Sequence, residues 1–472
     1  MNPQKFRSQA HKLVDWMADY LENITQLPVK SQVAPGEIYG QLPKDPPSKP
    51  EKVEGIVEDF IETILPGITH WQHPHFHAYF NANSSFPSVL AEMLTATIGA
   101  QCMLWDTSPA AAELEELMME WLGKMLGLPS GFTGVIQDGA SPATLCALLT
   151  AREKASSYQI NKHGPAKDPK YRVYCSQEAH SSAEKAMQIA GLGSNNLIKI
   201  AVDHNYALIP SELKSAIDKD LKYGNQPLCV IATLGTTGST AIDPLPEIAQ
   251  VAQKYQIWLH VDAAWAGNAL VLPEYRWMIK GLEHADSFVS NPHKWMFTNF
   301  DCTSYFVKDP EALQKTFTAM PEYLRTQNHG KVNNYKDWGI TLGRRFRALK
   351  LWFVIREMGV EGIRQTIGNH IRWAKQLAQK IVEHPDFELL APAPLALVCF
   401  RYKPVQATEE DELTKLNQTL LERLNQSGKL YMTHTKLSGK YCLRLVFGQT
   451  NLKKKHVNEA WQWVREEAAN LS

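Results

Sequence analysis

Apolar residues recur at helical spacing near the start of the chain and form one stripe: Phe6, Leu13, Val14, Met17, Leu21 and Ile24. A proline-rich polar stretch at 28–50 follows, and its composition is typical of a linker. A second apolar run at 56–64 predicts another short helix. Roughly 80 residues are too few to bury both stripes, so we expect this segment to pack on a larger body or on a second subunit.

The middle of the chain alternates apolar, strand-like runs with helical stretches, which is the pattern of a mostly parallel α/β sheet. The strand candidates are 171–175, 228–234, 257–262 and 286–289. Two helix starts are marked by a serine followed by a proline, at Ser108-Pro109 and at Ser141-Pro142. Gly127 is placed to end the first of these helices.

The last part of the chain, beyond Arg344, has a different pattern. A long helix is followed by a strand at 394–403, a hairpin of 430–436 and 440–447 joined at Ser438-Gly439, and a final helix. We therefore expect three parts: an N-terminal helical segment at 1–85, a large α/β domain at 86–345 and a small α+β domain at 346–472.

Composition and charge exclude several classes of protein. The 472 residues include 49 Lys and Arg against 49 Asp and Glu, so the chain lacks the basic field that nucleic acids or anionic membranes attract. No apolar run approaches the roughly 20 residues of a membrane span, and the first residues do not resemble a secretory signal. The seven scattered cysteines form no CxxC pair, as expected of reduced thiols. We expect a cytoplasmic protein whose partners include neither nucleic acid nor membrane.

Polar residues follow each of the four strand candidates, and the four that we single out are His180, Thr237, Asp262 and Lys294. Because the carboxyl ends of parallel strands meet at one edge of a sheet, these side chains are expected to lie close together. Each also has an ordinary structural interpretation, since a strand-end aspartate is often salt-bridged, a lysine usually lies at the surface and a histidine often caps a helix.

Asp262 and Lys294 together suit one cofactor. A lysine held in an Asn-Pro-His-Lys-Trp setting can lose its charge and become a nucleophile, while a carboxylate ending an apolar strand requires a cationic partner. Pyridoxal phosphate takes a lysine at its aldehyde and a carboxylate at its ring nitrogen. His180 would supply a flat partner for the ring, and the helix start at Ala140-Ser141 would supply donors for the phosphate.

Seven segments of the chain also resemble a known family: HPHFHAYF (73–80), SPAAAELEELMMEWLGKML (108–126), YCSQEAHSSAEKA (174–186), ATLGTTGS (232–239), WLHVDAAWAG (258–267), ADSFVSNPHKW (285–295) and LGRRFRALKLWFV (342–354). In this order they resemble the aromatic-L-amino-acid decarboxylases, which are group II pyridoxal-phosphate-dependent decarboxylases. The resemblance extends from Trp16 to the last helix. It implies the aspartate-aminotransferase-like fold (fold type I) and a homodimer in which the segment 1–85 packs on the partner, with Phe80 and Met103 close to the partner's cofactor.

The resemblance also implies roles for matching residues. Lys294 would bind pyridoxal 5'-phosphate covalently, Asp262 would pair with the ring nitrogen and His180 would stack on the ring. The other cofactor contacts would be Thr237, Ala140, Ser141, Asn291 and His293. The substrate pocket would be lined by Trp71, Tyr79, Phe80, Ala82, Gln101, Met103 and Gly343.

Tyr323 bears on the product of the reaction. It lies in the polar stretch 321–338, which we interpret either as a lid over the site or as an ordinary exposed loop. In the family, a tyrosine on a mobile loop protonates Cα, and Tyr323 matches it. Relatives with phenylalanine there, or with a replaced active-site histidine, tend to be decarboxylating aldehyde synthases. Because the chain has both Tyr323 and His180, it resembles a decarboxylase that releases an amine, with the aldehyde synthase as the alternative.

The choice of substrate depends on a few departures from the family. Animal relatives that act on catechol amino acids carry Pro-Thr at Asn81-Ala82, and Ile and Phe at Gln101 and Met103. Gly343 matches the glycine of indole-accepting plant relatives and leaves room for a bicyclic ring. We therefore favour tryptophan or 5-hydroxytryptophan over DOPA, tyrosine and phenylalanine. A non-aromatic substrate, such as glutamate, would require more charge around the pocket.

Three other functions can be weighed against the pattern. The residues His70, His73, His75 and His77 have spacing that invites a transition metal, although the family uses this segment as pocket wall and needs no metal. An aminotransferase with the same fold would normally carry an arginine dedicated to the α-carboxylate, and no motif identifies one. A binding protein without activity would be expected to have lost Lys294 or Asp262, and both are present.

Overall fold

The computed structural model describes residues 1–165, 170–319 and 330–471. These residues form two compact units. Unit 1 consists of 1–81, 376–390 and 398–472, and unit 2 consists of 82–375 and 391–397. The sequence led us instead to divide the chain at residues 85 and 345, and that three-part division stays a prediction.

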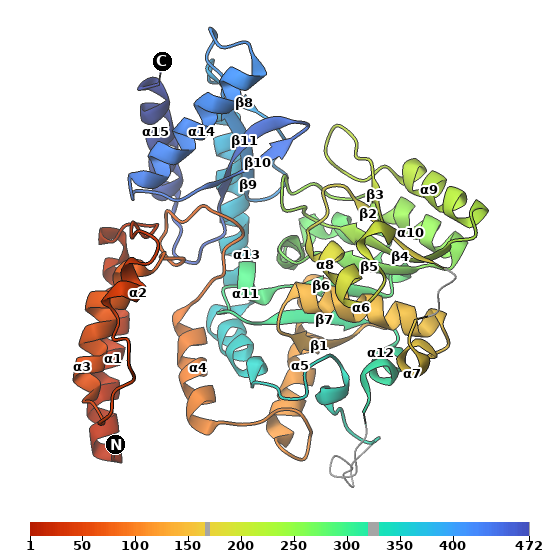
Figure 1. The fold of residues 1–472 in the computed structure, drawn as a ribbon, viewed down its shortest axis with the longest axis horizontal. Helices are drawn as coiled ribbons and strands as arrows, with labels where there is room; N and C mark the ends of the chain where they lie inside the picture. The colour runs from red at the N-terminus through yellow and green to blue at the C-terminus, as the bar shows by residue number, and fades with distance from the viewer. Residues whose placement is uncertain (166–169, 320–329, 472) are drawn as a thin grey trace. The chain divides into compact units, whose positions relative to one another are not determined.

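Unit 2 is built on a seven-stranded sheet in the order β1-β7-β6-β5-β4-β2-β3 (Figure 1). The strands are β1 (Thr133–Gln137), β2 (Tyr171–Ser176), β3 (Leu197–Ile200), β4 (Gln226–Thr233), β5 (Trp258–Asp262), β6 (Ser287–Ser290) and β7 (Thr303–Val307). β6, β5, β4, β2 and β3 are parallel, and β7 runs antiparallel to both of its neighbours. The mostly parallel α/β sheet predicted from the sequence is therefore confirmed.

Unit 2 also contains helices, several of which pack on the sheet. They are α4 (Phe86–Ile98), α5 (Pro109–Leu126), α6 (Ala140–Ala155), α7 (Ile160–His163), α8 (Ser182–Ile189), α9 (Pro210–Lys222), α10 (Leu245–Tyr255), α11 (Pro292–Trp295) and α12 (Pro310–Phe317). α6 packs against five strands, β1 and β4 to β7. Buried side chains such as Leu148, Val173, Met187 and Ile231 join α6 and α8 to the sheet in one apolar cluster.

The two predicted helix starts have different outcomes. α5 begins at Pro109, and Gly127 ends it with a φ of 69°, as predicted. Ser108 occupies the N-cap position of α5, but its side chain makes no capping hydrogen bond. The second start was misplaced, because α6 begins at Ala140 with Gly139 as N-cap, so Ser141 already lies in the first turn. Proline is tolerated inside the first turn since the N–H it lacks has no intrahelical partner, and the Ser-Pro pair alone did not fix the boundary.

Unit 1 combines both ends of the chain. Its helices are α1 (Pro3–Asn23), α2 (Glu37–Gln41), α3 (Val53–Asp59), α14 (Glu410–Gln426) and α15 (Lys454–Ala469). Its sheet has the order β10-β11-β9-β8, with β8 (Phe387–Leu389), β9 (Leu397–Tyr402), β10 (Thr433–Leu437) and β11 (Lys440–Val446). The predicted hairpin is confirmed, because Ser438 and Gly439 join β10 to β11 with φ values of 49° and 82°.

The segment before unit 2 is held by the C-terminal part of its own chain. The His77 N–H donates to the Tyr431 carbonyl at 2.8 Å, and the Val446 N–H donates to the His77 carbonyl at 3.0 Å. Phe76, which is fully buried, packs against Tyr431. The backbone at 75–77 is therefore fixed within unit 1, and the predicted linker at 28–50 contains the short helix α2.

One long helix, α13 (Arg347–Val382), belongs to both units, and the predicted long helix is thus present but interrupted. Gly359 inside it has φ 63° and ψ 165°, values outside the helical region. Across the described ranges, no helix combines the length and apolar character needed to cross a membrane.

Candidate active site

The three chemically central residues come from three strands of the same sheet, the neighbours β5 and β6 and, beyond β4, the strand β2. Asp262 is the last residue of β5, Lys294 lies in α11 directly after β6, and His180 follows β2. These strands are parallel, so their carboxyl ends lie at the same edge of the sheet. The groups are close enough to interact electrostatically, since Asp262 acts on both Lys294 and His180. The structure therefore brings together the residues that the sequence singled out.

The electrostatics of Lys294 favour a neutral amine. Burial lowers the pKa of Lys294, and the carboxylate of Asp262 opposes this shift. Asp262 is 8% exposed, and its Oδ1 accepts a hydrogen bond from the Ala264 N–H at 3.0 Å. A lysine with a lowered pKa spends more time as the uncharged nucleophile that an aldehyde requires.

His180 presents an exposed ring at this edge. The Ser182 N–H donates to its Nδ1 at 3.1 Å, so a neutral His180 carries its proton on Nε2. Partial burial lowers the pKa of His180, Asp262 raises it, and Lys294 lowers it further. At neutral pH the side chain is therefore a flat, uncharged ring that is exposed at this edge of the sheet.

The start of α6 supplies unsatisfied donors. Gly139 is the N-cap, and no side chain caps the first turn. Helix N-termini leave backbone N–H groups without intrahelical partners, and these groups together with the helix dipole attract anions. Ala140 and Ser141 lie in this first turn, so both predicted phosphate-binding residues are placed where an anion would be bound.

Two of the other predicted cofactor residues, Asn291 and His293, already make hydrogen bonds within the protein. Oδ1 of Asn291 accepts from the Thr303 hydroxyl at 2.9 Å, and Nδ1 of His293 accepts from the Cys302 N–H at 3.0 Å. Burial lowers the pKa of His293 to about 3, so Nε2–H is the group that this ring can still offer to a ligand. Thr237 is exposed.

Asn83 is a residue of this site that the sequence analysis missed. Its N–H donates to the His293 carbonyl at 3.0 Å, and its side-chain amide donates to the carbonyl of Lys294. Asn83 is 2% exposed and precedes α4. No motif marks it, because its partners are backbone carbonyls that any residue would provide.

The predicted substrate-pocket residues fall into both units. Trp71, Tyr79 and Phe80 belong to unit 1, where the rings of Trp71 and Tyr79 stack with centroids 5.8 Å apart. The residues predicted in unit 2 are Ala82, Gln101, Met103 and Gly343.

The structure brings two of the unit 2 residues together. Oε1 of Gln101 accepts from the Arg344 N–H at 2.6 Å, and a Cβ added at Gly343 would lie 3.3 Å from Nε2 of Gln101. Tyr323 lies outside the described residues.

The four histidines considered for a metal have other partners. Nδ1 of His70 bonds to the Tyr20 hydroxyl at 2.7 Å, and Nδ1 of His77 bonds to the Val446 carbonyl at 3.1 Å. Nδ1 of His73 accepts from the His75 N–H at 3.0 Å, and the His75 ring pairs with Glu459 at 3.1 Å. Nowhere in the described part of the chain do three or more His, Cys, Asp or Glu side chains gather as a metal ion would require. The seven cysteines are all buried, and none forms a disulfide.

The donor set fits pyridoxal phosphate. It combines a partly buried amine, a carboxylate, a flat ring and an uncapped helix start at one edge of the sheet. In addition, the hydroxyl oxygens of Thr233 and Ser290 are buried at the ends of β4 and β6 and make no hydrogen bond within the described residues. Thr233 lies beside Asp262 in the strand register. Such orphaned groups are uncommon in a protein interior and are expected where a ligand completes the site.

Comparisons with known proteins agree with this chemistry. The model of the pyridoxal-dependent decarboxylase conserved domain matches residues 35–403. A phenylacetaldehyde synthase of Arabidopsis thaliana is 44% identical, with 100% of this chain and 97% of the relative covered. A tyrosine decarboxylase of Petroselinum crispum, number 4, is 43% identical, with 100% and 94% covered.

Two solved structures are similar along the whole chain. The tryptophan decarboxylase of Catharanthus roseus, in complex with L-tryptophan, has a TM-score of 0.94 and 36% identity, covering 100% of this chain and 99% of that one. The TDC of Oryza sativa, with PLP and tryptamine, has a TM-score of 0.96 and 34% identity, again covering 100% and 99%. This similarity bears out the predicted fold type I.

Proposed function

Because the chain belongs to the pyridoxal-dependent decarboxylase family, we propose that it converts an aromatic L-amino acid into the corresponding amine and carbon dioxide. Family membership makes it a pyridoxal-phosphate-dependent carboxy-lyase. The observation that carries the proposal is the meeting of Lys294, Asp262 and His180 at the sheet edge. Whole-length similarity to a phenylacetaldehyde synthase and a tyrosine decarboxylase supports an aromatic substrate.

The proposed roles follow from the chemistry of the side chains. Bound pyridoxal phosphate supplies an aldehyde and an electron-accepting pyridinium ring. Lys294, with its lowered pKa, provides the neutral amine for that aldehyde, and Asp262 holds the proton on the ring nitrogen. His180 covers the ring and keeps water from one face. Thr237 helps to hold the ring side, and the first turn of α6, with Asn291 and His293, binds the phosphate end.

The amine, rather than the aldehyde, is the proposed product. Tyr323 is the proposed proton donor to Cα on the basis of sequence alone, and His180 is retained beside Lys294. An aromatic aldehyde synthase is the second candidate, favoured by the 44% identity to the phenylacetaldehyde synthase. The two candidates differ in their products, so one assay separates them.

Tryptophan or 5-hydroxytryptophan is the proposed substrate, ahead of DOPA, tyrosine and phenylalanine. The support comes from Gly343, because a side chain there would press against Nε2 of Gln101 at 3.3 Å. Glycine at 343 therefore keeps a larger side chain out of this part of the predicted pocket, and a bicyclic indole requires more space than a phenol ring.

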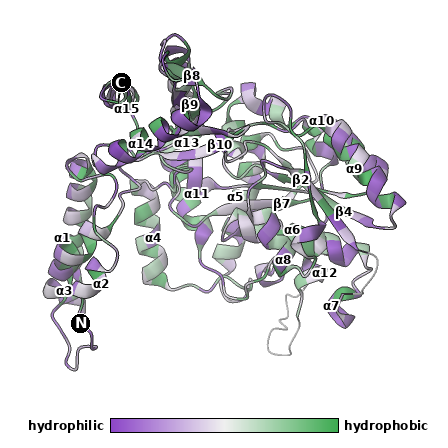
Figure 2. Cartoon of the chain, turned by 45° about the horizontal axis from the view of Figure 1, so that its top comes forward, coloured by the Kyte–Doolittle hydropathy of each residue, from purple (hydrophilic) through white to green (hydrophobic). Residues whose placement is uncertain are grey.

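A homodimer is proposed from an exposed apolar face on α4. Phe86, Leu90, Leu94 and Ile98 are spaced by four residues and are 59%, 52%, 44% and 61% exposed. Figure 2 shows α4 as apolar along most of its length. A contiguous apolar stripe of this kind is expected to be covered, and the proposed partner is a second copy of the chain, with Phe80 and Met103 near its cofactor.

The test is a product assay with the protein loaded with pyridoxal phosphate. Tryptophan, 5-hydroxytryptophan, DOPA, tyrosine, phenylalanine and glutamate are supplied separately, and amine, aldehyde and carbon dioxide are measured. We expect tryptamine or its 5-hydroxy analogue with an equal amount of carbon dioxide. Lys294→Ala should lose the visible absorption of the bound cofactor and at least 1000-fold in activity, because no other described group offers the amine. Lys280→Ala, which removes an exposed lysine, is the matched control.

Three results would change the proposal. Aldehyde, ammonia and hydrogen peroxide in place of the amine would establish the synthase instead. Activity with glutamate but with none of the aromatic amino acids would refute the aromatic substrate. Full activity in Lys294→Ala would refute the assignment of the lysine.

A further inference from the structure

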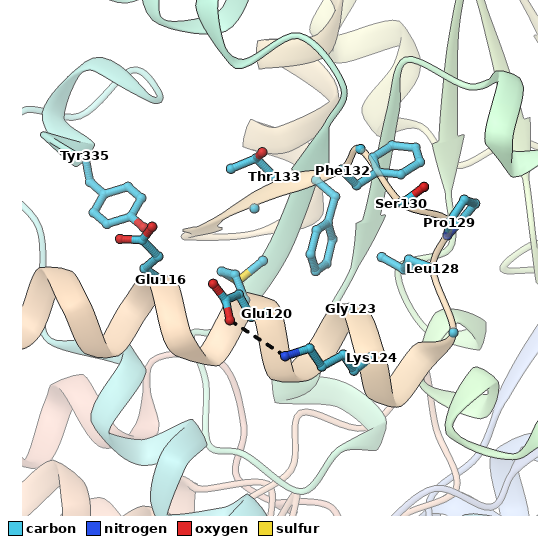
Figure 3. Close-up of a pocket in the computed structure, with 15 residues that line it drawn as sticks. Glu116, Glu120, Gly123, Lys124, Leu128, Pro129, Ser130, Phe132, Thr133 and Tyr335 are labelled. Atoms are coloured by element: carbon cyan, nitrogen blue, oxygen red, sulfur yellow. Dashed lines mark ion pairs between the residues drawn. The ribbon is translucent and has the colours of Figure 1, made fainter. Parts of the chain in front are cut away.

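Unit 2 contains a hollow of about 730 Å³ outside the candidate active site (Figure 3). It lies between α5, the loop that follows it and the start of β1, and Tyr335 forms part of its wall. Pockets for small molecules usually measure about 300–1,000 Å³, so this hollow is large enough for a molecule the size of an amino-acid derivative.

One wall of the hollow is apolar and aromatic. Phe132, Phe306 and Met119 line it, and Phe306 is 2% exposed. Four glycines, Gly123, Gly127, Gly131 and Gly134, also line the hollow and contribute no side chains that would fill it. Aromatic rings with a neighbouring thioether attract flat ligands through stacking and edge contacts.

Helix α5 also brings acidic residues to the hollow. Glu116 and Glu120 stand one turn apart on α5, and Lys124 pairs with Glu120 at 3.8 Å (Figure 3). Within the described ranges, Glu116 forms no ion pair. A carboxylate next to aromatic rings is the combination that recognises organic cations, because the rings add cation–π attraction to the charge.

Tyr335 is the second feature that points to a ligand. The residue is 2% exposed, and its ring is held by the guanidinium of Arg344, 5.1 Å from the ring centroid. Its hydroxyl is directed toward Glu116 in Figure 3. Burial raises the pKa of Tyr335, and Glu115 and Glu116 raise it further, so the phenol stays protonated. A protonated phenol next to a carboxylate places two oxygen acceptors where a ligand with several N–H donors can reach both.

We propose that this hollow binds a primary aromatic ammonium ion. The ammonium group lies between the Glu116 carboxylate and the Tyr335 hydroxyl, and the aromatic ring packs against Phe132 and Phe306. An ammonium group donates to both oxygens, and the apolar wall excludes ligands without an aromatic or similarly flat part. If the proposed function holds, the reaction product belongs to this chemical class, and the hollow is then a second site for the product.

The hollow is separate from the site of Lys294. β1 and β6 are both antiparallel to β7, so they run in the same direction. Thr133 and Gly134, which line the hollow, start β1, whereas Lys294 follows the end of β6. The hollow therefore lies toward the amino ends of these strands, and the site of Lys294 lies toward their carboxyl ends.

The test is calorimetric titration of the cofactor-loaded protein with tryptamine and 2-phenylethylamine. We expect the wild type to bind these amines at a site whose dissociation constant rises at least tenfold in Glu116→Gln and in Tyr335→Phe. Tyr335→Phe keeps the ring and removes only the hydroxyl. Glu311→Gln removes an exposed carboxylate that does not line the hollow, and it should bind as the wild type does. Bound-cofactor absorption and the midpoint of thermal unfolding verify that the variants are folded.

The ligand series distinguishes this site from nonspecific binding of cations to acidic side chains. Ethylamine has the ammonium group but no ring, and 3-ethylindole has a ring but no ammonium group, so both should bind at least tenfold more weakly than tryptamine. Equal binding of ethylamine and tryptamine would overturn the proposal, as would variants that bind tryptamine unchanged. If the protein binds tryptamine in the hollow but makes no amine, the proposed function is refuted and the second site is retained. Binding that is lost in Lys294→Ala is binding at the catalytic site, whereas binding in the hollow should persist in that variant.

Discussion

At the scale of single residues, the candidate site depends on backbone contacts as much as on reactive groups. The turn that carries Lys294 is held on one side by Cys302, which bonds to His293 through both its N–H and its carbonyl. Asn83 holds the other side through the carbonyls of His293 and Lys294. The position of the lysine amine is therefore set by residues that take no part in the chemistry, as is usual for catalytic groups.

Asn83→Asp tests this arrangement. Aspartate has the same shape, but it replaces the amide donor with an oxygen that repels the Lys294 carbonyl. We expect kcat to fall about tenfold or more with a smaller change in KM, since a lost hydrogen bond of about 1.4 kcal/mol corresponds to a factor of ten. The absorption maximum of the bound cofactor should also shift. Asn195→Asp, at an exposed position, is the control, and an unchanged spectrum together with an unchanged kcat would contradict the role of Asn83.

Asn83 is also an example of a site residue that could not be predicted from the sequence. Asp262, Lys294 and His180 were found because strand ends in a parallel sheet must meet and because their side chains have distinctive chemistry. Asn83 is 211 residues from Lys294 in the chain, and its partners are carbonyl groups. A contact of this kind leaves no pattern in the sequence, and it becomes visible only when the fold places the two segments side by side.

At the scale of elements, periodicity identified most helices and strands, and caps located their ends with mixed success. Gly127 ended α5 as predicted, because a left-handed residue is a strong local signal. The start of α6 was misplaced because Gly139, which lacks a side chain, gives no capping signal. The break at Gly359 in α13 was also missed, since the apolar spacing continues across it.

The exposed stripe of α4 gives a prediction at this scale. Leu90→Glu should convert the proposed dimer into monomers at micromolar concentration, measured by sedimentation equilibrium. Each copy would bury one leucine, at about 1.5–3 kcal/mol each, so the dissociation constant should rise at least 100-fold. Leu221→Glu, on α9, changes a leucine that is 47% exposed and should leave the association unchanged. A wild-type protein that sediments as a monomer would refute the homodimer.

At the scale of the whole molecule, buried histidines link folding to pH. Burial is the largest cause that lowers the pKa of seven histidines, to about 4 for His73, about 2 for His75, about 3 for His77, about 4 for His260, about 3 for His293, about 3 for His370 and about 4 for His456. They lie in both units. The folded chain therefore holds them neutral over a pH range in which the unfolded chain would protonate them.

Stability should consequently fall as the pH drops below 6.5. Between pH 6.5 and about 4 the unfolded state binds more protons, so the free energy of unfolding decreases, by about 1.4 kcal/mol per histidine at pH 5.5. Asp243 acts in the opposite direction, because burial raises its pKa to about 7 and the folded state takes up its proton first. Burial also raises the pKa of Asp286 and of Glu178, but these three carboxyls are outnumbered by the seven histidines, so a net loss of stability is expected.

Urea unfolding at pH 7.5, 6.5 and 5.5 measures this dependence. His370→Leu should be less stable than the wild type at pH 7.5, because the Trp295 N–H loses its acceptor, but it should lose less stability on acidification. His11→Gln, at an exposed position, should leave the slope unchanged. A free energy of unfolding that does not change between pH 7.5 and 5.5 would contradict the prediction.

The first turn of α6 has no side-chain cap, and as a result thermal stability and affinity for the proposed phosphate favour different residues at position 139. A serine, aspartate or asparagine in place of Gly139 would cap the helix and stabilise it by roughly a few tenths of a kcal/mol. The same side chain would occupy the donors that the proposed phosphate requires, and aspartate would also repel it. Selection for heat resistance alone would therefore favour a substitution at 139 that selection for cofactor retention opposes. Under the proposed function, the ligand itself takes the place of the missing cap, and the chain is most robust when it is loaded.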